Sequence, residues 1–94
     1  MGSDALDIFN VLVLSYNHEE FRMYEHQFLQ KNRRSFEKRK LVPRLIRVND
    51  YHKILGYRDM PLVQVGNWMS HPDAQKIIEY ADTHGIKIIE GKID

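Results

Sequence analysis

Asn10-Val-Leu-Val-Leu-Ser15 is the stretch that decides the fold class of this chain. Its central residues are apolar on both faces of an extended backbone, and β-branched valines alternate with leucines. An antiparallel strand at a protein surface alternates apolar and polar residues, whereas a strand buried between two layers of helices does not. The stretch therefore predicts a central strand of a parallel sheet over residues 10–15.

The residues after this strand predict a helix over residues 18–31. Asn17 and Glu20 have the spacing of a capping box. Phe21, Tyr24 and Phe28 then lie at positions i, i+3 and i+7, which places them on one face of a helix.

The rest of the chain repeats the alternation of strand and helix. Ser70-His-Pro-Asp73 predicts the start of a second main helix over residues 71–84, with Ser70 as its cap. Gly85 ends this helix. The helix has an apolar stripe at helical spacing, formed by Ala74, Ile77, Ile78 and Ala81. Three further strands are expected, at residues 44–48, 62–66 and 86–90, and a short helical turn is expected at residues 51–57. Pro43 marks the entry to the strand at 44–48.

This order predicts one α/β domain over residues 1–94, a small Rossmann-like three-layer unit. Four short, mostly parallel strands, two main helices and one short helical turn make up the unit. Residues 1–5 are expected to lie outside it, as a cloning remnant or a disordered end.

Composition excludes several classes of function. The chain has no cysteine, so disulfides, thiolate catalysis and cysteine-bound metals are excluded. No apolar run has the length of a membrane span, and no signal peptide opens the chain, which predicts a cytoplasmic protein without a membrane partner. Three further motifs are missing: the glycine-rich dinucleotide turn, the P-loop and the nucleophile elbow.

Polar and aromatic residues follow the first three predicted strands, where ligands bind in open parallel sheets. The candidate ligand-binding residues are Ser15, Asn17, His18, Asp50, Arg58, Asn67, Trp68 and His71. The alternative is that these side chains only cap helices and fill loops. The histidine spacings match no local metal-ligand pattern, so we expect no metal and no cofactor.

Charge is concentrated in residues 31–47, the basic segment. Eight basic residues and Glu37 give it a net charge of +7, in a chain whose net charge is +1, so the rest carries −6. The candidate nucleic-acid-binding residues in it are Arg33, Arg34, Lys38, Arg39 and Lys40. The alternative is a solvated connection formed by a helix end or a loop.

Short motifs in the chain resemble small Rossmann-like proteins encoded by bacteriophages. They are the first strand with Glu20-Phe21 after it, Leu55-Gly-Tyr-Arg-Asp59 before Val63-Gln-Val-Gly66, and His71-Pro72 at the last helix. The resemblance implies an accessory or host-interaction role and assigns no catalytic residue. The basic segment is not part of the shared pattern.

Three functions follow from these observations as alternatives. The first is a non-catalytic protein that binds a nucleotide or nucleic acid through the strand ends or the basic segment. The second is a protein-interaction factor that inhibits or redirects a host protein, with a dimer as an open possibility. The third is a small nucleotide-processing enzyme that uses His18, Asp50 or His71 as acid or base. We favour the first two functions, which need no catalysis, over the enzyme.

Overall fold

A computed structural model describes residues 7–66 and 68–93. The expected terminal extension, residues 1–5, lies outside these described residues. The elements in chain order are β1 (Asp7–Ser15), α1 (His18–Arg39), β2 (Leu41–Val48), the 3₁₀ turn η1 (Tyr51–Ile54), β3 (Pro61–Val65), the 3₁₀ turn η2 (Trp68–Ser70), α2 (Ala74–Thr83) and β4 (Lys87–Gly91).

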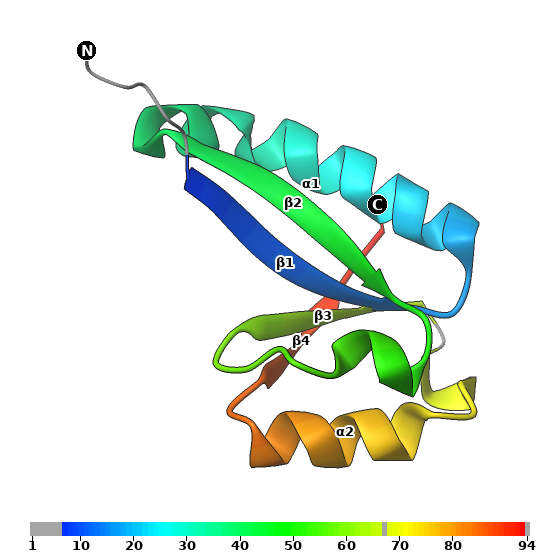
Figure 1. The fold of residues 1–94 in the computed structure, drawn as a ribbon. Helices are drawn as coiled ribbons and strands as arrows, with labels where there is room; N and C mark the ends of the chain where they lie inside the picture. Colours follow the sequence, from blue (N-terminus) through cyan, green and yellow to red (C-terminus); the bar gives the residue numbers. More distant parts are fainter. Residues whose placement is uncertain (1–6, 67, 94) are drawn as a thin grey trace.

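The four strands form one parallel sheet in the order β2-β1-β3-β4. This confirms the α/β prediction and the central place of β1. Helix α1 covers one face of the sheet, and η1 and α2 cover the other (Figure 1). The strand order reverses between β1 and β3, because the chain moves outward from β1 to β2 and then returns to the far side of β1.

Side chains of β1 alternate between two hydrophobic cores. Leu12 and Leu14 belong to the core under α2, while Val11 and Val13 belong to the core under α1. All four are at most 3% exposed. The two-sided apolar pattern of residues 10–15 therefore has its predicted cause, which is burial on both faces of the sheet.

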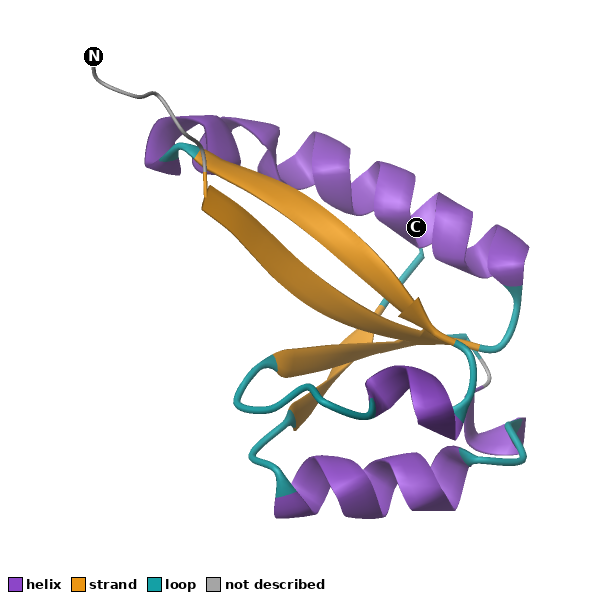
Figure 2. Cartoon of the chain, in the orientation of Figure 1, coloured by secondary structure: helices purple, strands orange, loops and turns teal. Residues whose placement is uncertain are grey.

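The first part of β1 extends beyond β3. Residues 7–11 pair with β2 alone, and pairing with β3 begins only at Leu12. The amino-terminal halves of β1 and β2 thus form a two-stranded ribbon that projects from the sheet (Figure 2). The molecule is correspondingly elongated, with extents of 48 × 29 × 17 Å.

Helix α1 is longer than the sequence analysis predicted. It begins as expected at Asn17, whose Oδ1 accepts hydrogen bonds from the N–H groups of Glu19 and Glu20. It continues to Arg39 rather than ending near residue 31, so its 22 residues span about 33 Å. The added turns pack on the ribbon through Phe36, whose ring lies 5.6 Å from that of Phe9.

The connection from α1 to β2 is also shorter than predicted. Lys40 adopts the left-handed conformation (φ 57°), and its N–H donates to the carbonyl of Glu37. This one-residue turn leads directly into β2 at Leu41, ahead of the expected entry at Pro43. The basic segment therefore forms the end of α1, the turn at Lys40 and most of β2. The helix-end alternative is confirmed for residues 31–39, and the loop alternative is wrong.

The start of α2 differs from the capping box predicted at Ser70. Ser70 lies in η2, and the N-cap residue is Asp73, whose side chain makes no capping hydrogen bond. The Asp73 carboxylate instead accepts from the N–H of Tyr51, 2.8 Å away, and so ties α2 to η1. The end of α2 agrees with prediction, because Gly85 follows the helix with φ 69°.

Replacement of Ile77 by alanine should lower the free energy of unfolding by about 2–5 kcal/mol, because its side chain is fully buried in the core under α2. Ile78, which belongs to the same predicted apolar stripe, packs only partly against that core. Ile78→Ala should therefore cost less than Ile77→Ala. Urea unfolding of both variants measures the difference, and equal losses would contradict this orientation of α2.

Candidate functional site

The carboxyl ends of β1 and β2 and the residues before α2 line an open cleft of about 380 Å³, which we call the rim pocket. Its lining residues are Tyr16, Arg47, Asn49, Asp50, His71, Pro72 and Asp73. Of the eight predicted ligand-binding residues, the structure brings two, Asp50 and His71, into this pocket.

Five of the other predicted ligand residues, Ser15, Asn17, His18, Arg58 and Trp68, do not line the rim pocket. Ser15 is fully buried, with its hydroxyl donating to the Asn17 carbonyl, and Trp68 belongs to the core under α2. His18 is exposed on the first turn of α1. Arg58 lies in the loop before β3, at the amino ends of the parallel strands, whereas the rim pocket lies at their carboxyl ends. Asn67 lies outside the described residues.

Both ring nitrogens of His71 are used to hold the loops together. Its Nδ1 accepts from the N–H of Asp73 at 3.0 Å, so Nε2 carries the proton and donates to the carbonyl of Asn49. Proton transfer at either nitrogen would break one of these hydrogen bonds. The geometry therefore gives His71 a structural role rather than that of an acid or base.

Two further polar groups of the rim pocket, the Asp50 carboxylate and the Arg47 guanidinium, also make loop contacts. Asp50 caps η1 by accepting from the N–H of Lys53, and an Nη of Arg47 donates to the Tyr16 carbonyl. The Nε of Arg47 is buried without a hydrogen-bond partner in the described chain. Across the described residues, no three histidine, aspartate or glutamate side chains lie close enough to hold a metal ion.

The basic segment presents a different surface. The side chains of Arg33, Arg34, Lys38, Arg39, Lys40 and Arg44 are exposed, and we call this surface the basic end. Arg33 forms an ion pair with Glu37 at 3.1 Å. Among the described residues, the other five have no ion-pair partner. All five predicted nucleic-acid-binding residues thus lie together, on the last two turns of α1 and its C-cap.

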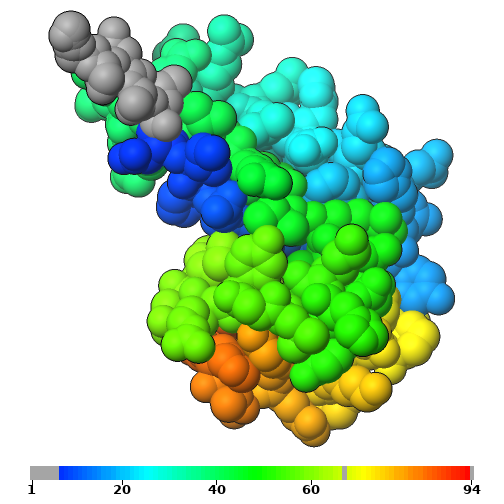
Figure 3. Space-filling model, viewed as in Figure 1, coloured from blue at the N-terminus to red at the C-terminus, as the bar shows by residue number. Residues whose placement is uncertain are grey.

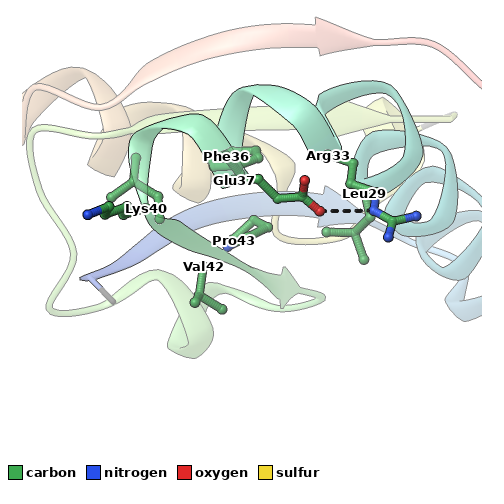
Figure 4. A pocket seen from close by; sticks show the side chains of 8 residues that line it. Leu29, Arg33, Phe36, Glu37, Lys40, Val42 and Pro43 are labelled. Atoms are coloured by element: carbon green, nitrogen blue, oxygen red, sulfur yellow. Dashed lines mark hydrogen bonds and ion pairs between the residues drawn. The ribbon is translucent and has the colours of Figure 1, made fainter. Parts of the chain in front are cut away.

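A groove within the basic end is the feature that the sequence analysis missed. It has a volume of about 490 Å³ and lies between the end of α1 and the start of β2. Its walls are mainly apolar, and charged residues lie at its mouth (Figure 4). The lining residues are Leu29, Arg33, Phe36, Glu37, Lys40, Leu41, Val42 and Pro43. The sequence does contain one sign of this groove. Leu29 and Phe36 lie seven residues apart, which places both on one face of a helix.

A third region joins α1 to the end of β4. Gly91 lies so close to α1 that a Cβ there would come within 2.5 Å of Val63 Cγ1 and 3.1 Å of the Tyr24 ring. Burial raises the pKa of the Tyr24 phenol above its ordinary value, while the charge of Lys31 acts in the opposite direction. Tyr24 is therefore neutral near pH 7 and serves as a packing residue.

Replacement of His71 by alanine should lower the free energy of unfolding by about 1–3 kcal/mol, because it leaves the Asp73 N–H and the Asn49 carbonyl without their partner. The control is His18→Ala, which removes an exposed histidine and should change stability by less than about 0.5 kcal/mol. Urea unfolding measures both. Equal stability of the two variants would contradict the structural role of His71.

Comparison with known proteins identifies no relative. No protein-family model, no curated protein and no solved structure matches this chain. The resemblance to phage-encoded proteins therefore stays a prediction. In the part of the chain that the structure describes, no helix is both long and apolar enough to cross a membrane.

Proposed function

We propose that this protein is a non-catalytic module that binds nucleic acid through its basic end. The observation that carries the proposal is the set of exposed basic side chains at the end of α1 and the start of β2. Five of them lack an ion-pair partner among the described residues. Cations in that state attract phosphates without first having to break internal ion pairs.

The position of these residues supports contact with an extended polyanion. Arg33, Arg34, Lys38 and Arg39 project from the last turns of one long helix, and Arg44 projects from the strand that follows it. These elements occupy the end of the molecule opposite α2 (Figures 1 and 3). A phosphate backbone could therefore contact several of them without meeting the rest of the fold.

The rim pocket gives weaker support to either an enzyme or a nucleotide-binding protein. Three of its titratable side chains make hydrogen bonds that hold the loops together, namely those of His71, Asp50 and Asp73. The first turn after β1 is Tyr16-Asn17-His18, without the glycine that lets a backbone approach a pyrophosphate closely. For these reasons we favour the basic end over the rim pocket.

Binding should weaken steeply as salt increases. If the five residues of the basic end that lack an ion-pair partner in the described chain each neutralise one phosphate, log K against log[salt] should have a slope of about −3.5 for a single strand. Fluorescence anisotropy with a labelled oligonucleotide at several salt concentrations measures this slope. A slope near zero would contradict phosphate contact and would favour the protein-interaction alternative.

Reversal of Arg33, Arg34, Lys38 and Arg39 to glutamate should abolish this binding while the protein stays folded, because all four side chains are exposed. The matched control reverses Lys53, Lys76, Lys87 and Lys92, which are also exposed and lie outside the basic end. Both variants have the same net charge, so equal losses of affinity would contradict a localised surface. Circular dichroism verifies that each variant is folded.

A further inference from the structure

The groove in the basic end combines an aromatic wall with a charged mouth. Phe36, Val42 and Pro43 form apolar walls (Figure 4). The charged lining residues are Lys40 and the ion pair of Arg33 with Glu37. Val42 is 41% exposed, and Leu29, at the other end of the groove, is 38% exposed. The groove is therefore an open apolar surface surrounded by the side chains that we propose contact phosphates.

The Phe36 ring is held in place by two other rings. Its centroid lies 5.6 Å from that of Phe9 on β1 and 5.9 Å from that of Phe28 on α1. Contacts on two sides restrict its rotamers, so little conformational entropy remains to be lost when a ligand packs against it. A fixed aromatic surface of this kind suits stacking.

We propose that the groove receives an unpaired base, so that the basic end prefers single-stranded nucleic acid to duplex. The inference rests on the proposed function. Bases in a duplex are stacked and paired, whereas a single strand can turn a base out onto an aromatic side chain while its phosphates contact flanking cations. The groove supplies the aromatic surface, and Lys40 and the neighbouring basic residues without an ion-pair partner in the described part of the chain supply the cations.

Two other occupants fit the groove less well. A second copy of the chain would bring two basic segments together, each with a net charge of +7, and like charges at that density repel. A purely acidic protein segment would pair with Lys40 and its neighbours but would leave the apolar walls of the groove uncovered. A single strand, which is anionic and carries apolar base faces, matches both features.

Three probes of equal length test the inference by fluorescence anisotropy: a single-stranded oligonucleotide, the same strand without bases, and the corresponding duplex. The wild-type protein should bind the base-bearing strand roughly 5- to 100-fold more tightly than the abasic strand, the range expected for one stacked base. It should also bind that strand more tightly than the duplex.

Phe36→Leu should reduce this ratio towards one, because it removes the aromatic face but keeps most of the apolar volume. The matched control is Phe21→Leu, which changes a buried ring fifteen positions earlier on α1 that neither lines the groove nor pairs with Phe36, and the ratio should persist. Loss of the ratio in both variants would mean that only packing is affected, and would overturn the inference.

Two further outcomes separate this inference from the proposed function. Equal, salt-dependent affinity of the wild-type protein for all three probes would overturn the groove inference and leave the basic end as a phosphate-binding surface. Absence of binding to every probe would overturn both. Polyglutamate of equal charge is the fourth probe, and binding as tight as that of the single strand would show that bases are not recognised.

Discussion

The burial of β1 on both faces and along both edges is the constraint on which this fold depends. Within residues 12–14, the strand is hydrogen-bonded to β2 on one side and to β3 on the other. Leu12 and Leu14 complete one core and Val13 completes the other. A polar residue at any of these positions would leave an unsatisfied group inside a packed layer. Because α1 and α2 are each seated on side chains of this one strand, the loss of β1 would remove the support of both.

The same strand also determines where the basic end lies. Beyond β3, β1 continues as a ribbon with β2, and Phe9 on this ribbon gives the last turns of α1 an apolar surface to pack on. Without the ribbon, residues 32–39 would be a highly charged helix end with no tertiary support. The long overlap of β1 with β2 is thus what orders the basic side chains and forms the groove between Phe36 and Val42.

The sequence was informative where one local pattern had one structural solution. The apolar pattern of residues 10–15 predicted β1, and the stripe from Ala74 to Ala81 predicted α2, because burial alone explains each pattern. The end of α1 was missed because basic residues are good helix formers, yet a run of them also suits a solvated loop. Only Phe36 and its contact with Phe9, a partner 27 positions earlier in the sequence, distinguish the two.

At the rim pocket the sequence analysis predicted too many ligand-binding residues. It placed polar residues near the strand ends but could not distinguish side chains available to a ligand from side chains bonded within the fold. Ser15, His71 and Asp73 are polar residues in the expected region, and each is committed to a hydrogen bond within the fold. Whether a loop side chain binds a ligand or its own backbone depends on distances between loops. No spacing in the sequence encodes those distances.

Some of the basic residues at the end of α1 stabilise the helix itself, so the argument for an anionic ligand depends on the others. Lys38 and Arg39 lie in the last turn, where the helix dipole favours cations by roughly 0.3–1 kcal/mol each, and Arg33 pairs with Glu37. The dipole effect falls off within one turn, so it does not account for Arg34, and it does not apply to Arg44 on β2. These two exposed cations, without ion-pair partners in the described chain, gain nothing from the fold and carry the argument for an anionic ligand.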